Sequence, residues 1–152
     1  MARRFGRHPA VIGWQIGNEY TDDSFDPDAR HAYHAWLRAK YGTIAALNRR
    51  WNTAYWSQTY DAWRQIPMVS ERANPGLLLD YKRFVTSQWR EFQRNQSEAI
   101  RAHAAPQQFI TTNLGGLGWA ARFNRREIAA DLDLITWDEY VGQGHVEPYR
   151  LG

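Results

Sequence analysis

Cysteine is absent from the 152 residues of this chain. The sequence therefore excludes disulfide bonds, metal sites built on thiolates and a cysteine nucleophile, so chemistry must come from carboxylates, histidines or hydroxyls. No apolar run is long enough to cross a bilayer, and the first residues lack the apolar core of a secretion signal. We therefore expect no membrane partner and a cytoplasmic location.

The chain also lacks a concentrated basic face. Its net charge of +3 comes from 19 basic and 16 acidic residues that are spread along the sequence and only locally clustered, as in residues 1–7. This distribution predicts no nucleic-acid partner. The Gly-x-Ser-x-Gly elbow of serine hydrolases is missing, and the glycines of residues 115–118 lack the spacing of a dinucleotide or phosphate loop. With 43% hydrophobic and 14% aromatic residues, the sequence is typical of one globular unit.

A short apolar stretch, residues 11–20, ends abruptly in Asn18 and Glu19. Such a run predicts a strand buried on both faces, and in an α/β barrel the carboxyl end of a strand displays catalytic side chains. Trp14 and Tyr20 offer apolar surroundings that would raise the pKa of the Glu19 carboxyl, as suits a general acid. The alternative is a strand that ends in polar residues because it has reached water.

Strand and helix signals alternate along the rest of the chain. Asp26-Pro27 and Asn74-Pro75 are N-cap signatures, and Gly42 is a natural helix stop. The predicted elements are helices over residues 27–41 and 75–103, a short helix after Thr43, a strand over 109–113, a helical turn over 124–130 and a strand over 132–137. This order predicts parallel strands joined by crossovers. Parallel pairing would bring the polar residues at the three strand ends to one rim, where ligands bind in α/β proteins.

An ordered series of motifs extends over almost the whole chain and resembles the β-galactosidases of glycoside hydrolase family 42. The motifs are Trp14-Gln15-Ile16-Gly17-Asn18-Glu19-Tyr20, Lys40-Tyr41-Gly42-Thr43-Ile44, Leu47-Asn48, Trp51, Trp56-Ser57-Gln58, Asn74-Pro75, Asp80-Tyr81-Lys82-Arg83-Phe84, Thr112-Asn113, Asp133 and Trp137-Asp138-Glu139-Tyr140.

The resemblance implies an α/β fold that is part of a (β/α)8 TIM barrel, about strands 4 to 6 with their helices. It implies a retaining glycoside hydrolase that cleaves terminal β-D-galactosyl residues, with a β-galactoside as substrate. Glu19 would be the general acid/base, and Asn18 would hold a sugar hydroxyl. Trp56 and Tyr140 resemble residues that line the galactose subsite, and Asn113 is a further contributor. Flat rings suit the C–H patches of a sugar, and fixed amides suit its hydroxyls.

A retaining mechanism needs a second carboxylate about 5 Å from the first. In the resembling family this nucleophile is a glutamate at the end of the seventh strand, whereas this chain stops soon after the sixth. We therefore expect residues 1–152 to be an incomplete piece of a single catalytic barrel, with little or no turnover alone.

The resemblance implies no cofactor. Some members of the family carry a cysteine cluster that binds zinc after the Asn-Glu pair, but residues 20–30 contain no cysteine, so we predict no metal site. His31 and His34 are one helical turn apart and could grip a metal, although a solvated helix face is the favoured interpretation. Family members are commonly homotrimers, which makes a homotrimer an expectation for a full-length enzyme.

Two other functions stay open at this point. Another retaining barrel glycosidase, such as a β-glucosidase or an arabinosidase, would share the pair Asn18 and Glu19 but not the aromatic loop together with the motif of residues 137–140. A non-catalytic carbohydrate-binding module would need only the rings. Replacement of Glu19 separates this module from both enzymes, because only an enzyme would lose hydrolysis.

Overall fold

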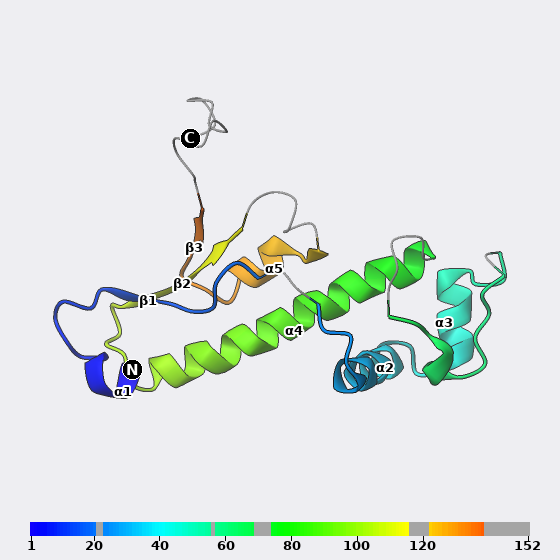
Figure 1. The fold of residues 1–152 in the computed structure, drawn as a ribbon, viewed down its shortest axis with the longest axis horizontal. Coiled ribbons are helices and arrows are strands. Elements are labelled where there is room, and N and C mark those ends of the chain that lie inside the picture. The colour runs from blue at the N-terminus through cyan, green and yellow to red at the C-terminus, as the bar shows by residue number, and fades with distance from the viewer. Residues whose placement is uncertain (21–22, 56, 69–73, 116–121, 139–152) are drawn as a thin grey trace, which may run out of the picture. The chain divides into compact units, whose positions relative to one another are not determined.

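The structure, a computed structural model, describes residues 1–20, 23–55, 57–68, 74–115 and 122–138 (Figure 1). In chain order the elements are α1 (Ala2–Phe5), β1 (Gly13–Gln15), α2 (Pro27–Tyr41), α3 (Ile44–Trp51), the 3-10 helix η1 (Trp63–Gln65), α4 (Pro75–Arg101), β2 (Phe109–Leu114), α5 (Arg125–Ala129) and β3 (Leu134–Trp137).

The chain divides into two compact units, which we describe separately. The sheet unit comprises Met1–Thr21, Arg90–Ala121 and Arg125–Gly152, and the helical unit comprises Asp22–Trp89 and Arg122–Asn124. Helix α4 therefore contributes residues to both units. None of the described helices is long and apolar enough to span a membrane.

The sheet unit contains a parallel sheet in the order β1, β2, β3 (Figure 1). In its register Gly13 pairs with Phe109, and Thr111 pairs with Leu134. Strand β2 is central and is buried along almost its whole length. Parallel strands require crossovers, which here pass through α2, α3 and α4 between β1 and β2 and through α5 between β2 and β3. The predicted strand order and parallel pairing are confirmed.

Strand β1 is shorter and more exposed than the sequence predicts. Only Gly13–Gln15 form the strand, and Ile12 is 73% exposed whereas Ile16 is 2% exposed. Within the described residues β1 pairs with β2 alone. An edge strand with one covered side explains the mixed burial, so the expectation of a strand buried on both faces is wrong here. Helices α1 and η1 were not predicted, because each is too short to show a hydrophobic period.

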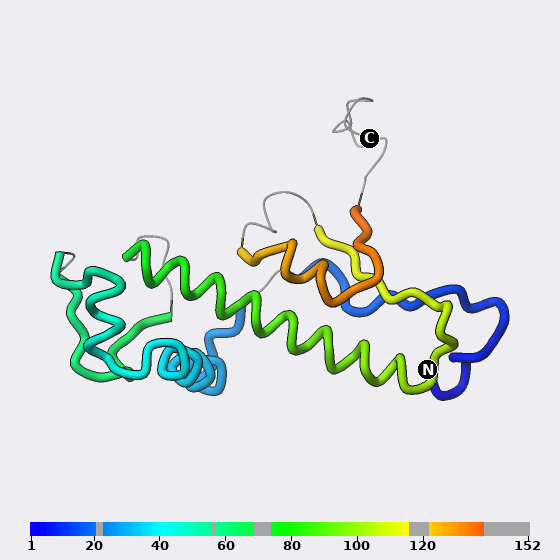
Figure 2. Tube along the Cα trace, turned by 180° about the vertical axis from the view of Figure 1, so that it is seen from behind, coloured from blue at the N-terminus to red at the C-terminus, as the bar shows by residue number. Residues whose placement is uncertain are grey.

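Helix α5 packs against α4 inside the sheet unit (Figure 2). The Gln93 side-chain amide donates to the backbone oxygen of Ile128 at 3.0 Å. Arg90 Nε lies 2.6 Å from Asp131 Oδ2, and Arg94 lies 3.2 Å from the other oxygen of that carboxylate. The hydrogen bond from Arg90 lowers the pKa of the Asp131 carboxyl. These contacts fix the segment that leads into β3.

In the helical unit, the predicted caps define the helix starts. The Asp26 carboxylate accepts a hydrogen bond from the backbone N–H of Ala29 at 2.8 Å, and the Thr43 hydroxyl accepts one from Ala46 at 3.1 Å. Gly42 ends α2 with φ +70°, a conformation in the left-handed region that glycine adopts without strain. The predicted boundaries of α2 are therefore confirmed at both ends.

An aromatic core holds α2 against the first half of α4. Tyr33 is fully buried, and its ring lies 5.4 Å from Tyr81 and 5.1 Å from Phe84 between centroids. Such ring pairs add about 0.5–1.5 kcal/mol beyond the area that they bury. Leu37 and Leu47 are also fully buried, so they place the predicted apolar faces of α2 and α3 in this core.

A buried carboxylate ties the ends of three helices together in the helical unit. Asp80 on α4 is 1% exposed and accepts hydrogen bonds from Lys40, Tyr41, Trp51 and Arg83. Burial acts to raise the pKa of the Asp80 carboxyl, but the donors together outweigh it and lower the pKa. Burial and the bond to Asp80 raise the pKa of Tyr41 to about 12.

Candidate active site

The carboxyl ends of the three strands bring together polar residues from distant parts of the chain. Asn18 follows β1, Asn113 lies near the end of β2, and Asp138 follows β3. In α/β sheets this edge is where ligands bind. The prediction that these strand ends share one rim is confirmed for the residues named here, which lie within hydrogen-bonding distance of one another.

Asn113 is the centre of this group. Its Nδ2 donates to Asn18 Oδ1 at 3.0 Å and to Asp138 Oδ2 at 2.8 Å. Its Oδ1 accepts from Gln15 Nε2 at 2.8 Å. The side chain is largely buried, and a buried amide needs such partners because unpaired polar groups are costly in the interior. We call these four residues the amide cluster.

The backbone between β1 and Tyr20 has two residues in the left-handed region. Gly17 has φ +61° and Glu19 has φ +41°. A Cβ at Gly17 would lie 2.4 Å from the ring of Tyr20, so both the backbone angle and the close ring require glycine there. Glutamate is uncommon at positive φ, and residues held in this way cluster at functional sites.

Glu19 is half-buried, next in the chain to the buried ring of Tyr20. The Tyr20 ring packs edge-on against Phe92 with centroids 6.2 Å apart. Burial raises the pKa of the Tyr20 hydroxyl, and a hydrogen bond with Thr112 acts in the opposite direction. The tyrosine therefore stays neutral.

A carboxyl group beside a fixed amide has a defined chemical capability. The carboxyl of Glu19 can give a proton to, or take one from, a bound molecule, and the amide of Asn18 can hold a hydroxyl. Among the described residues, no group of three or more histidine, aspartate or glutamate side chains is arranged to hold a metal ion.

Comparison with known proteins identifies the family. The sequence matches the glycoside hydrolase family 42 description, beta-galactosidase, over residues 1–150. The chain belongs to this family.

Curated and solved relatives agree with this assignment. The beta-galactosidase of Thermus thermophilus is 42% identical over 148 residues, which are 92% of this chain and 22% of that protein. The beta-galactosidase BglY of Alicyclobacillus acidocaldarius is 41% identical over 143 residues, with 92% and 20% covered. The crystal structure of the beta-galactosidase from Rahnella sp. R3 gives a TM-score of 0.84 at 34% identity over 96% of this chain and 22% of that chain. The chain thus spans 20–22% of the length of these family 42 relatives.

Of the residues predicted for the site, the structure places Glu19 and Asn18 at the rim, with Asn113 beside them. Trp56 and Tyr140 lie outside the described residues. Sequence reasoning missed Gln15 in this family 42 chain. Gln15 is a polar residue within an apolar run, and this pattern could have predicted that its side chain bonds to a polar group on a neighbouring strand.

Trp14, predicted near Glu19, has its polar end elsewhere. Its Nε1 donates to Gln108 Oε1 at 2.9 Å, and Gln108 precedes β2. The indole is thus tied to the amino end of β2, whereas Glu19 follows the carboxyl end of β1.

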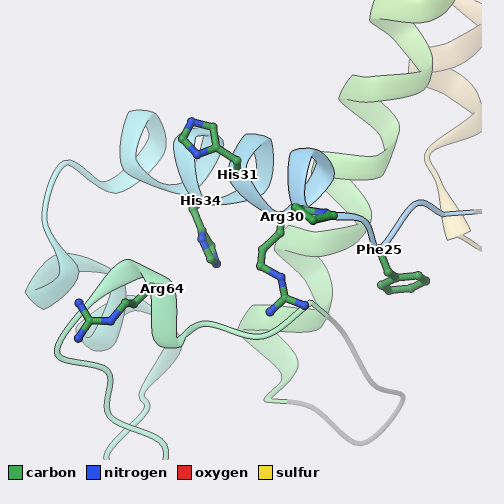
Figure 3. A pocket seen from close by; sticks show the side chains of 6 residues that line it. Phe25, Arg30, His31, His34 and Arg64 are labelled. Atoms are coloured by element: carbon green, nitrogen blue, oxygen red, sulfur yellow. The ribbon is translucent and has the colours of Figure 1, made fainter.

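An open pocket of about 320 Å³ in the helical unit does not form a comparable site (Figure 3). Its lining includes Arg30, His31, His34 and Arg64. His34 uses its Nε2 on the backbone oxygen of Ile66, 2.9 Å away. Figure 3 shows His31 and His34 leaving α2 in different directions and the Arg64 guanidinium turned away from Arg30. The side chains diverge, so they do not converge on one ligand.

Proposed function

We propose that this chain provides the acid/base side of a retaining β-galactosidase active site, with Glu19 as the general acid/base. The observation that carries the proposal is the place of Asn18 and Glu19 at the carboxyl edge of a parallel sheet, where Asn113 holds Asn18. Family 42 membership supports a β-galactoside as the substrate. The parallel sheet with crossover helices supports a share of a (β/α)8 barrel.

In the first step, Glu19 protonates the glycosidic oxygen while a second carboxylate attacks the anomeric carbon. In the second step, Glu19 takes a proton from water, which then hydrolyses the galactosyl-enzyme. Asp138 follows β3, which the resemblance matches to the sixth strand of the barrel, whereas the family's nucleophile follows the seventh. We place the nucleophile outside residues 1–152, in agreement with the chain's short span along its relatives.

We propose Trp56 and Tyr140 as walls of the galactose subsite. Both are aromatic: Trp56 stands in the aromatic-rich segment that follows α3 in the sequence, and Tyr140 follows β3. Rings of this kind bind the apolar face of a sugar.

The test uses a chimera in which residues 1–152 replace the matching segment of the Thermus thermophilus beta-galactosidase, which supplies the remaining parts. In this chimera Glu19→Gln should lower the hydrolysis of lactose by about 100-fold or more, the usual contribution of general acid/base catalysis. With a dinitrophenyl galactoside, Glu19→Gln should lower the rate of the first step less than it does with lactose, because the dinitrophenolate leaving group departs without protonation. Added azide should then restore turnover and give β-galactosyl azide.

The control is Glu98→Gln, which removes an exposed carboxylate on α4 and should leave lactose hydrolysis unchanged. Unchanged hydrolysis in Glu19→Gln would exclude Glu19 from catalysis and favour a binding module. A chimera that prefers aryl glucosides or arabinosides over galactosides would favour another retaining glycosidase. The unmodified chain alone should release no nitrophenol from an aryl β-galactoside above the buffer rate.

A further inference from the structure

The amide cluster contains one member whose direction of hydrogen bonding is fixed by chemistry. Asp138 presents a carboxylate oxygen to Asn113 at 2.8 Å, and a carboxylate only accepts. Asn113 must therefore turn its Nδ2 toward Asp138. When two amides bond only to each other, both can be flipped and the hydrogen bond between them is kept. Here the carboxylate of Asp138 fixes which end of the Asn113 amide carries the nitrogen.

This direction propagates through the cluster. The second Nδ2 proton of Asn113 goes to Asn18, which must meet it with its Oδ1 at 3.0 Å. The Oδ1 of Asn113 faces the other way and is met by Gln15 Nε2 at 2.8 Å. Asn113 thus uses both of its amide protons and its oxygen within the cluster, and its low exposure of 7% leaves little room for an alternative arrangement.

The consequence appears at Asn18. Its Oδ1 faces Asn113, its side chain is exposed, and its Nδ2 donates to none of the described residues. The group that Asn18 offers to the open side of the rim is therefore an N–H donor.

We propose that Asp138, acting through Asn113, sets the amide of Asn18 so that the enzyme recognises one sugar hydroxyl as a hydrogen-bond acceptor. Asp138 and Asn113 are positioning residues in this scheme, because they act on the substrate through Asn18. The proposal rests on the proposed function in one respect, namely that a galactose-configured sugar occupies the rim. It adds the polarity of the contact and the residues that determine it.

Fluorine substitution distinguishes the two polarities. A fluorine in place of a hydroxyl cannot donate but keeps a weak acceptor, whereas a hydrogen in that place does neither. A donor on the enzyme therefore tolerates fluorine better than hydrogen, and an acceptor on the enzyme loses its partner in both cases. Competitive inhibition constants of galactose and of its singly fluorinated and singly deoxygenated derivatives report this difference without the electronic effect of fluorine on bond cleavage.

The experiment uses the chimera described above and a variant that moves the carboxylate within the cluster, Asn113→Asp combined with Asp138→Asn. This swap conserves the net charge and the number of hydrogen bonds. It requires Asn18 to donate inward to the new carboxylate, which turns the Asn18 oxygen outward. A cooperative melt within a few degrees of the parent shows that the variant is folded.

In the parent, we expect one hydroxyl position at which the deoxy derivative binds about 3-fold more weakly than the fluoro derivative, near the low end for one hydrogen bond because fluorine is a weak acceptor. In the swap variant this ratio should fall to about 1 at the same position. A single variant, Asp138→Asn, should give an intermediate ratio, because the amide direction is no longer imposed. Asp133→Asn is the matched control, since Asp133 ties the other end of the β3 segment to Ile110 of β2, and it should preserve the parent ratio.

Two results would overturn the inference. One is equal loss for the fluoro and deoxy derivatives at every position of the parent, and the other is a ratio that the swap leaves unchanged. Failure of the proposed function is distinct, because it would appear as unchanged lactose hydrolysis in Glu19→Gln. If the swap does not fold, the ratio in Asp138→Asn decides: a value equal to the parent's contradicts the proposal.

Discussion

The helical unit and the sheet unit each contain a polar hub, and the two hubs are built differently. Asp80 is a buried charge that receives four donors from three helices. Asn113 is a neutral amide whose partners include the exposed Asn18 at the rim. The contacts of Asp80 stabilise the helical unit, whereas those of Asn113 orient Asn18, whose side chain can contact a ligand.

Charge explains why the hubs differ in energy. Removing one partner of a buried ion pair is strongly destabilising because the other charge stays desolvated. A neutral hydrogen bond contributes about 0.5–1.5 kcal/mol net, since water competes for the same groups. We therefore expect substitutions in the helical unit to change the free energy of unfolding most. Substitutions in the sheet unit should mainly change whether the protein offers a hydrogen-bond donor or acceptor to the ligand.

The largest expected loss follows from Asp80→Asn. Lys40 and Arg83 lose their common partner, and we expect the free energy of unfolding to fall by about 3 kcal/mol, the low end for a broken buried pair because both cations can reach water. Denaturant unfolding monitored by tryptophan fluorescence measures it. Asp61→Asn, at an exposed position, is the control and should change stability by less than about 0.5 kcal/mol. Equal effects would contradict the assigned role of Asp80.

Acid should produce a smaller loss through the same group. The folded pKa of Asp80 is below its ordinary value of 3.8, so the folded state binds fewer protons than the unfolded state near that pH. The stabilisation is present above pH 3.8 and is lost as the pH falls through the lowered folded pKa. Each unit of pKa difference corresponds to about 1.4 kcal/mol. Denaturant unfolding measured at several pH values should show that the free energy of unfolding depends less on pH in Asp80→Asn than in the parent. An equal pH dependence would contradict the assignment to Asp80.

Asn74→Ala should destabilise the helical unit by about 1–2 kcal/mol. Asn74 caps α4 by accepting from the Gly76 N–H at 2.7 Å, and its Nδ2 donates to the backbone oxygen of Trp51 at 3.0 Å. Asn74→Ser keeps an oxygen that can cap α4 and removes the amide donor, so its unfolding free energy separates the two contributions. If both variants lose the same amount, the cap contributes nothing measurable.

Asn113→Ala should have the smallest effect on stability, about 1 kcal/mol, because Asn18 and Asp138 can reach water at the rim. The same variant in the chimera should reduce the difference between fluoro and deoxy galactose derivatives to an intermediate value, as in Asp138→Asn, since Asn18 is then free to turn. Thermal melts and inhibition constants of one preparation give both values. A loss as large as that of Asp80→Asn would remove the distinction between the hubs.

Local chemistry made much of the fold predictable. Asp26, Thr43 and Asn74 each precede a helix, and the cap depends on neighbours within a few residues. The meeting of Asn18 and Asn113 was also predictable, although 95 positions separate them, because parallel strands bring their carboxyl ends to one edge.

The hubs themselves were less accessible to sequence reasoning. Asp80 resembles other acidic residues in sequence, and only the packing of three helices shows that it is buried. The direction of the amide cluster depends on Asp138 facing Asn113 across two strands, a relation set by register. The limited burial of β1 was mispredicted because an apolar run shows that a strand favours burial. It does not show whether other elements cover both faces of that strand.

Within the described residues, β1 and β3 each have a neighbour on one side only. Their outer edges present backbone N–H and C=O groups in the spacing of a parallel ladder, and Trp137 on β3 is 42% exposed. The sheet is therefore a template on both sides. A strand added at either edge would pair with β1 or β3, whose registers are set by β2. Backbone hydrogen bonds would therefore fix the distance between Glu19 and a carboxylate at the end of the added strand.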